Sequence, residues 1–277
     1  MKRLHVNWVS TIILVFVIFF SFSPHCFSGS NSSPPTWLKK GVYAKYTFPS
    51  GHLFLANPTA RYGIDSIDFS DGMFRWECVD LVEDFAKLKL TVEYVETRKN
   101  GEDLEEPIPR NLSTEVDVNT FNRGLYLQNG SLVGRTTLWL PANATLDTVI
   151  TIWDVPPDKV TIKPTNTTSL GMSPQGTQPA LKISSFANGT INGKNISLHG
   201  LWDLNTGVML SQVMEHEAAF TALNITDWIA NGVFEDTNID LGPPNKNPED
   251  PRLLMLISVP AVFVILSVLI FNHKRKK

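Results

Sequence analysis

The segment Lys87–Val95 reads Lys-Leu-Lys-Leu-Thr-Val-Glu-Tyr-Val, so apolar and polar residues alternate along it without a break. Because successive side chains of a β-strand point to opposite faces, this pattern predicts a strand with one buried face and one solvated face. Met73–Asp80 alternates in the same way. The two segments place these residues on their apolar faces: Phe74, Trp76, Cys78, Leu88, Leu90, Val92 and Tyr94.

Similar short segments continue along the chain and are separated by turn dipeptides such as Asn129-Gly130 and Asn192-Gly193. Sequential strands joined by short turns predict a mainly β, antiparallel domain with one packed face. The further expected strands are Val42–Phe48, Ile64–Phe69, Glu115–Phe121, Val133–Leu140, Thr148–Trp153, Leu181–Phe186, Asn195–Trp202 and Val208–His216.

Three segments depart from the strand pattern. Asp154–Pro179 contains five prolines and many Ser and Thr residues, which favours a long surface loop within one domain over a domain boundary. Ala218–Val233 is the one expected helix, within a fold of one or two short helices. Leu241–Arg252 contains four prolines and is expected to form a stiff stalk.

Both ends of the chain carry apolar blocks. Residues 1–28 begin with Lys2-Arg3, continue into an uncharged apolar run and end in polar and small residues, which indicates a secretory signal peptide or an uncleaved anchor. Residues 253–271 contain no charge and are long enough to cross a bilayer, and the basic tail 272–277 is expected on the cytoplasmic side. The expected topology is a single C-terminal span in the cell membrane, with the β domain of residues 29–240 outside the cell.

The segment between the two apolar blocks is acidic. Residues 29–252 hold 18 basic and all 27 acidic residues, a net charge of −9. Such a surface disfavours nucleic acid as a partner and is repelled by anionic lipid headgroups. Removal of a signal peptide that contains Cys26 leaves Cys78 alone, which excludes an internal disulfide.

The same segment contains eight Asn-x-Ser/Thr sequons, whereas about three are expected by chance from its Asn, Ser and Thr content. Together with the export signals, this excess predicts a multiply N-glycosylated protein of an archaeon or a eukaryote. The candidate glycosylation sites are Asn31, Asn111, Asn129, Asn143, Asn166, Asn188, Asn195 and Asn224.

The segment Leu198–Leu210 contains the pattern Trp202-Asp203-Leu-Asn-Thr-Gly207-Val. In a hairpin, Asp203 can cap the turn and Gly207 can adopt a positive φ. This hairpin resembles one in uncharacterised archaeal membrane-anchored surface proteins, which also share an opening like Gly41–Phe48 and paired strands like Phe74–Glu96. It is also similar to hairpins of bacterial lipoprotein carriers. The resemblance implies a curved antiparallel sheet or half-barrel, with an apolar groove for lipid, and assigns no site residues.

Two motifs resemble metal sites but lack essential ligands. Glu215-His216-Glu217 begins a zinc-protease motif, yet Phe220 stands where the second His is required. Asp236, Asn238 and Asp240 have calcium-loop spacing, but the Gly and Glu expected further along are replaced by Leu241 and Asn247, so a helix-ending turn is favoured over a weak calcium site. We therefore expect no metal and no cofactor.

The remaining candidates favour structural roles. Asp65, Asp68 and Asp71-Gly72 are interpreted as a solvated hairpin turn, and Cys78 as a core residue. No complete catalytic motif is present in the sequence. The sequence therefore predicts a non-catalytic binding or structural module for a lipid, glycan or protein ligand. The alternative is a surface hydrolase that uses carboxylates such as Asp203, Glu215 and Glu217.

Overall fold

The computed structural model describes residues 33–141, 144–171, 173–191, 193–213 and 217–242, all of which belong to one compact unit. The expected signal, membrane-spanning and tail segments (1–28, 253–271 and 272–277) and all but the first two residues of the expected stalk lie outside the described residues. Within these residues the elements are β1 (Tyr43–Ala56), β2 (Ile64–Val82), β3 (Phe85–Lys99), β4 (Glu102–Asn119), β5 (Gly124–Leu127), β6 (Leu132–Arg135), β7 (Ile150–Trp153), β8 (Val160–Ile162), β9 (Asn166–Leu170), β10 (Gln178–Ile191), β11 (Lys194–Asp203), β12 (Met209–Val213), α2 (Ala218–Ala222), β13 (Ile225–Ala230) and β14 (Val233–Thr237).

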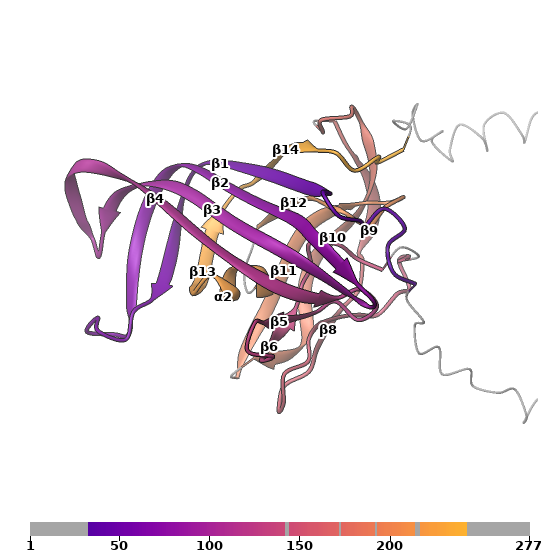
Figure 1. Cartoon of the computed structure of the whole chain (residues 1–277), viewed down its shortest axis with the longest axis horizontal. Helices are drawn as coiled ribbons and strands as arrows, with labels where there is room; N and C mark the ends of the chain where they lie inside the picture. The colour runs from indigo at the N-terminus through magenta and orange to yellow at the C-terminus, as the bar shows by residue number, and fades with distance from the viewer. Residues whose placement is uncertain (1–32, 142–143, 172, 192, 214–216, 243–277) are drawn as a thin grey trace, which may run out of the picture. The chain divides into compact units, whose positions relative to one another are not determined.

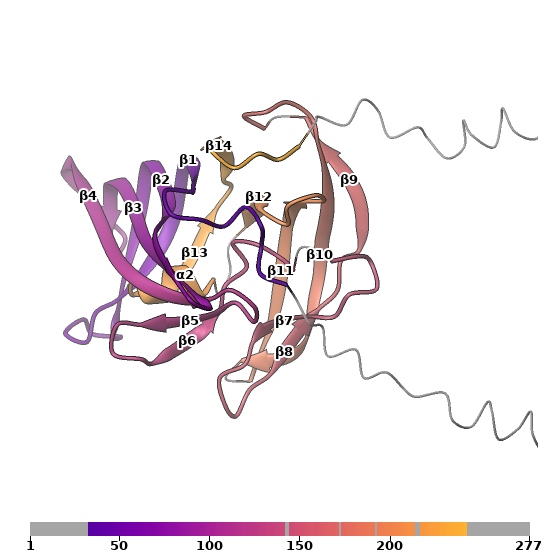
Figure 2. The same cartoon turned by 45° about the vertical axis from the view of Figure 1, so that its right-hand side comes forward.

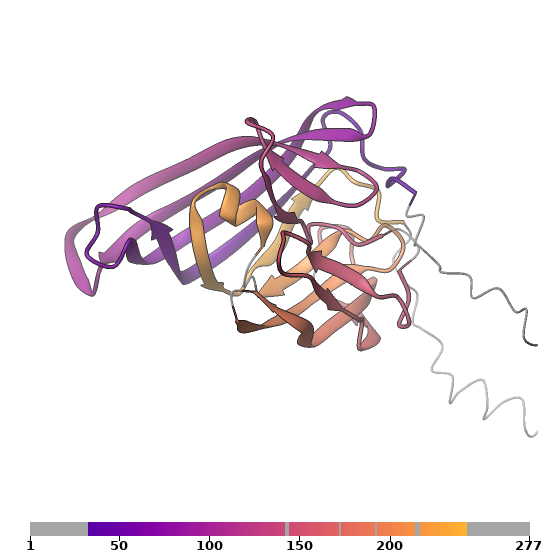
Figure 3. The ribbon, with the colours of Figure 1, turned by 90° about the horizontal axis from the view of Figure 1, so that it is seen from below.

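The strands form two antiparallel sheets, which confirms the mainly β prediction (Figure 1). The first has the order β13-β1-β2-β3-β4-β5-β6, with β14 also pairing with β1. The second has the order β12-β11-β10-β8-β7, with β9 pairing with β10. In the first sheet the long strands β1–β4 curve around α2, as in a half-barrel (Figure 3).

Register shifts between β2 and β3 help this sheet to curve, because a β-bulge bends the strand and increases its local twist. One shift lies between Ser70 and Met73, where Asp71 has a φ of 49°. The expected hairpin turn at Asp71-Gly72 is therefore wrong. The two expected strands on either side of it are one continuous strand, and Asp71-Gly72 is a bulge within it.

In β2 and β3 the alternating apolar residues are the buried ones, as the sequence pattern predicted. Phe74, Trp76 and Cys78 are buried on β2, as are the four predicted apolar residues of β3. The two sheets lie opposite each other (Figure 2), and these side chains form one buried cluster with residues of the second sheet such as Ile183 and Leu198. Tyr46 on β1 donates a hydrogen bond from its hydroxyl to the carbonyl of Met209 on β12, at 2.7 Å, which joins the two sheets directly.

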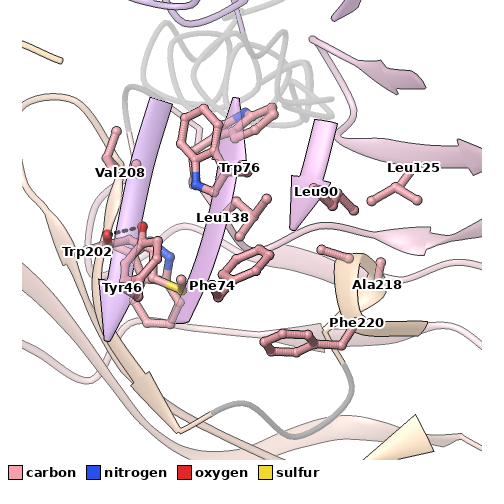
Figure 4. Packing of buried hydrophobic residues seen from close by; sticks show 14 of the residues in the cluster. Tyr46, Phe74, Trp76, Leu90, Leu125, Leu138, Trp202, Val208, Ala218 and Phe220 are labelled. Atoms are coloured by element: carbon pink, nitrogen blue, oxygen red, sulfur yellow. Dashed lines mark hydrogen bonds between the residues drawn. The ribbon is translucent and has the colours of Figure 1, made fainter. Parts of the chain in front are cut away.

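The core between the sheets is rich in aromatic side chains (Figure 4). Trp76 and Trp139 lie with their ring centroids 6.0 Å apart, and Phe220 of α2 stacks on Trp228 at 4.7 Å. Trp202 donates its indole N–H to the carbonyl of Thr137 at 2.7 Å. These rings occupy the inner face of the curved sheet, where the resemblance to lipoprotein carriers implied a lipid groove.

Two further expectations are corrected. The expected helix Ala218–Val233 ends after Ala222, because Asn224 adopts a left-handed conformation with φ 62° and the following residues form β13. The Pro-rich segment Asp154–Pro179 is not an unbroken loop, since it contributes β8 and β9 to the second sheet. Proline is compatible with both strands because they are short and flanked, not interrupted, by it.

No helix among the described residues is long and apolar enough to cross a bilayer. The expected span at residues 253–271 lies outside them and stays a prediction.

Candidate functional site

The Asp203–Gly207 turn joins β11 to β12 and is held by one buried carboxylate. Asp203 Oδ2 accepts hydrogen bonds from the backbone N–H and the hydroxyl of Thr206, both at 2.7 Å, and from the N–H of Asn205 at 3.1 Å. Gly207 has a φ of 75°, and a Cβ at this position would lie 2.7 Å from the carbonyl oxygen of Leu140. The turn therefore requires a carboxylate or amide acceptor at its first position and a glycine at its last.

Both ends of the described domain contact this turn. Trp37, close to the N-terminal end, donates its indole N–H to the carbonyl of Thr206 at 2.8 Å. Asn205 donates its side-chain N–H to the carbonyl of Leu241, at the C-terminal end, at 3.2 Å. Gln175 accepts a further hydrogen bond from the N–H of Leu241 at 3.0 Å. The turn predicted from the sequence is thus the point at which the two ends of the described domain meet.

Burial raises the pKa of the Asp203 carboxyl, while the hydrogen bonds from Thr206 and Asn205 lower it. The carboxylate has no exposed surface. A group in this position can hold a loop in one conformation, but it cannot meet a substrate from solvent without opening of the turn.

Glu217 is also buried, and both of its carboxylate oxygens are engaged. It accepts hydrogen bonds from the Thr136 hydroxyl at 2.6 Å, from the N–H of Thr137 at 2.9 Å and from the N–H of Ala219 at 3.2 Å, and it also contacts the Thr137 hydroxyl. Through Ala219 it caps the N-terminus of α2. These contacts give Glu217 a structural role. Glu215 and His216 lie outside the described residues.

Arg123 is also buried. It contacts the carbonyl of Thr136, the residue whose hydroxyl donates to Glu217. Its guanidinium donates to the carbonyls of Thr136 at 3.0 Å, Trp139 at 3.4 Å and Thr151 at 2.6 Å. Burial lowers the pKa of Arg123 to about 10, and the negative charge of Glu217 partly offsets this effect. The sequence places Arg123 in a polar turn and provides no signal that it is buried.

Three polar side chains form a chain of contacts on the outer face of β1 and β2. His52 Nδ1 contacts the carboxylate of Asp68, and His52 Nε2 lies 3.2 Å from the hydroxyl of Ser66. The antiparallel register places His52 directly opposite Asp68, and Ser66 follows two residues away on the same face. Phe54 packs edge-on against the imidazole, with the ring centroids 4.6 Å apart.

This acid–imidazole–hydroxyl order is the one in which a carboxylate orients a histidine and the histidine accepts a proton from a nucleophilic serine. No motif in the sequence marks it, because only the register of β1 against β2 brings these residues together. Asp65, expected to be a solvated turn residue with Asp68, is instead buried. Hydrogen bonds from Asn100 and Asn57, together with Lys99, lower the pKa of Asp65 to about 2.

The candidate glycosylation sites can be placed for six of the eight sequons. The exposed asparagines are Asn111, Asn129, Asn166, Asn188, Asn195 and Asn224. Exposure is required of an acceptor asparagine in the folded protein but does not show that it carries a glycan. Asn111 donates its side-chain N–H to Glu93 at 3.1 Å. Asn31 and Asn143 lie outside the described residues.

The residues with calcium-loop spacing bind other parts of the chain. Asp236 accepts a hydrogen bond from the Tyr43 hydroxyl at 2.8 Å, and Asn238 bonds the backbone of Tyr43 and Gly41. Asp240 accepts the N–H of Gly242 at 2.9 Å. Across the part of the chain that the structure describes, no group of three or more His, Cys, Asp or Glu side chains is arranged to hold a metal ion.

Comparison with known proteins yields little similarity. No family model and no curated protein matches the chain. Among solved structures, the chain is similar to a protein of Bacteroides fragilis described as exported and as having a YmcC-like fold, with 9% identity and a TM-score of 0.29 over 72% of this chain and 96% of that one. A TM-score this low does not establish a shared fold.

Proposed function

We propose that this chain is a glycosylated surface protein anchored by a single C-terminal span, and that its β domain is a non-catalytic binding or structural module outside the cell. The observation that carries the proposal is that both ends of the described domain contact one turn, through the hydrogen bonds Trp37–Thr206 and Asn205–Leu241. A domain whose ends leave from one point can be presented on a membrane by a single attachment. The six exposed sequon asparagines agree with an extracellular location.

The packed inner face of the sheet disfavours a role as a shuttling lipid carrier. The side chains that would line a lipid groove, such as Phe74, Trp76 and Phe220, are 2% exposed or less. A lipid could enter only if these rings moved apart, and packed cores resist such opening. A partner is therefore expected to bind the outer surfaces of the domain.

The experiment is expression of the full chain in a host that performs N-glycosylation, followed by extraction of membranes with alkaline carbonate. We expect the chain to stay in the membrane and a matched chain that ends at Arg252 to be released. Glycosidase treatment should increase the electrophoretic mobility of both chains. Release of the full chain by carbonate would overturn the proposed anchor, and unchanged mobility would overturn the proposed glycosylation.

The binding role is tested on the purified full chain by native mass spectrometry from detergent, with analysis of an organic extract alongside. A bound molecule in fixed ratio to the chain would identify a ligand. Its release after unfolding, together with retention of the bare chain mass, would separate it from the covalent glycans.

A second candidate function is a surface hydrolase, favoured by the contacts among Ser66, His52 and Asp68. In this function, Ser66 Oγ attacks an ester carbonyl as its proton passes to His52 Nε2. The proton then goes to the leaving alcohol, and water releases the acyl group from Ser66. The buried Asp203 and Glu217 are not suited to the carboxylate mechanism that the sequence allowed.

A fluorophosphonate probe separates the two functions, because it reacts with an activated serine. Labelling of the full chain at Ser66, lost in Ser66→Ala and in His52→Gln, would establish the hydrolase. Ser70 is a matched control, since it lies on the same strand and its hydroxyl contacts Asp71 instead of a histidine. A chain that resists the probe, while a known serine hydrolase in the same tube reacts, would rule the hydrolase out.

A further inference from the structure

Four exposed apolar side chains lie around the turn of the β2–β3 hairpin, at one end of the curved sheet, and we call them the end patch. They are Leu81, Val82, Phe85 and Phe121, with 41%, 60%, 40% and 41% of their surface exposed. Leu81, Val82 and Phe85 flank the turn of the β2–β3 hairpin. Val82 pairs with Phe85, whereas Leu81 lies on the other face of the strand, where it lines a depression with Phe121. Phe85 also pairs with Asn119, the last residue of β4, which is two residues before Phe121. Large apolar side chains exposed side by side mark a contact surface more often than single ones do.

The end patch adjoins the start of the described domain. Leu81 and Phe121 line a depression of about 240 Å³, together with Pro34, Pro35 and Leu38. Of these three residues, Pro34 is exposed and adds to the apolar surface, while Pro35 and Leu38 are buried beneath it. They also connect the patch to the segment that leads, through Trp37, to the turn at Thr206.

The C-terminal end of the domain leaves from the same side. Leu241 is held by Asn205, next to the residue that binds Trp37. In Figures 1 and 3 the β2–β3 hairpin and both ends of the described chain lie on one side of the domain. Residues 243–252 then separate the domain from the expected span, and ten residues reach at most about 35 Å. Residues 243–252 are thus short enough to keep the domain near the bilayer, but long enough that the domain need not touch it.

We propose that the end patch rests on the outer leaflet of the bilayer that anchors the chain, with its apolar side chains in the interfacial region. This inference depends on the proposed membrane anchor. The patch residues Leu81 and Phe121 are interleaved with the acidic side chains Glu83 and Asp84, and the domain as a whole is acidic. The contact is therefore hydrophobic and favours neutral headgroups, because anionic lipids would repel the acidic residues.

The test uses the full chain in phosphatidylcholine vesicles, with an environment-sensitive fluorophore on a single introduced cysteine. One variant carries Val82→Cys in the patch. The control carries Tyr62→Cys, which is 78% exposed in the loop before β2, at the opposite end of that strand. Cys78 is buried, and Cys26 is replaced by Ser in both variants. Lipids brominated on their acyl chains quench a fluorophore that reaches the interface.

We expect blue-shifted emission and quenching by brominated lipid at position 82, neither effect at position 62, and no loss of quenching in high salt. Adding Phe85→Ser and Phe121→Ser should reduce the quenching at position 82 while carbonate still fails to extract the chain. Equal, solvent-like emission at both positions in a carbonate-resistant chain would overturn the inference and leave the anchor intact.

Two other results are also decisive. Blue-shifted emission at position 82 without quenching by lipid would show that protein, such as a second copy of the chain, covers the patch, and this would overturn the bilayer contact. Release of the chain by carbonate would overturn the anchor, and the inference with it. The two failures are thus distinguished by the extraction step alone.

Discussion

Replacement of Glu217 by Gln is expected to destabilise the domain, although it changes only one oxygen to an amide nitrogen. Each carboxylate oxygen of Glu217 accepts one backbone N–H. In either orientation of the Gln amide, an NH2 group, which donates hydrogen bonds, replaces one of these two oxygens. The orphaned donor is the N–H of Ala219 in one orientation and of Thr137 in the other. Hydroxyl groups can rotate to accept a hydrogen bond, but a backbone N–H cannot.

The magnitude follows from these contacts. A buried donor left without an acceptor costs about 1–3 kcal/mol. The remaining hydrogen bonds lose the charge assistance of a carboxylate, which makes such bonds roughly twice as strong as neutral ones. Arg123, which is buried beside Thr136, also loses the nearby negative charge of Glu217. Together these effects predict a decrease of about 2–4 kcal/mol in the free energy of unfolding.

The assay is urea unfolding of the full chain in detergent micelles, followed by tryptophan fluorescence. Trp202 is a suitable reporter because it donates to the carbonyl of Thr137, next to the Glu217 contacts. The matched control is Glu235→Gln, because Glu235 pairs with Lys45 at 2.9 Å in an exposed position and such pairs contribute about 1 kcal/mol or less. Equal stability of Glu217→Gln and the control would refute the structural role and make Glu217 available again as a catalytic carboxylate.

Three further predictions concern single side chains. The raised pKa of Asp203 means that the folded state binds its proton more tightly than the unfolded state, so its contribution to stability is complete below about pH 4 and is lost as pH rises through the folded pKa. Asp203→Asn should remove this decline in the unfolding midpoint above about pH 4, whereas Asp203→Ala should cost about 1–3 kcal/mol through lost hydrogen bonds at every pH. The pH dependence from Asp65 has the opposite sign, because folding lowers its pKa from 3.8 to about 2. Its contribution to stability is present above pH 4 and is lost as the pH falls toward 2. An unfolding midpoint of Asp65→Asn that falls as steeply as that of the wild type between pH 4 and 2 would contradict the assignment. Gly207→Ala should destabilise the domain more than Gly130→Ala in the same urea assay. Gly207 and Gly130 both have a positive φ, of 75° and 81°, but only at Gly207 would an added Cβ meet the Leu140 carbonyl. Equal losses of stability would show that the backbone at Gly207 shifts freely.

The strand pattern could be predicted from sequence because the period of two is a local property. Leu88, Leu90 and Val92 are buried as their alternation indicated. The bulge at Asp71-Gly72 could not be distinguished from a turn, since both use the same residues and differ only in whether the chain reverses. The end of α2 was missed for a similar reason: Asn224 ends the helix by its own backbone conformation, while Ile225–Ala230 pairs with the distant β1.

In the candidate site, too, contacts between residues close in sequence could be predicted, and contacts between distant residues could not. Asp203 and Gly207 lie four residues apart, so the sequence could indicate their turn. The contacts of His52 with Asp68 and Ser66 depend on the register of two strands, and those of Glu217 with Thr136 join residues 81 positions apart. Residue types alone could not select these pairs from the other Ser, Thr and acidic residues of the chain.

The outer surface therefore determines what the domain can do, because the inner face is occupied by its aromatic core. Along β2 the His52 contacts at Ser66 and the end patch at Val82 are 16 residues apart, a distance of at most about 55 Å in an extended strand. Because Ser66 lies near the opposite end of β2 from the end patch, we expect a domain that rests on the patch to hold the Ser66 hydroxyl away from the lipids of the same membrane. Any acyl group that reaches Ser66 must then come from solution or from an opposing surface. Hydrolysis of lipids in the chain's own vesicle, together with quenching at position 82, would mean that one of the two assignments is wrong.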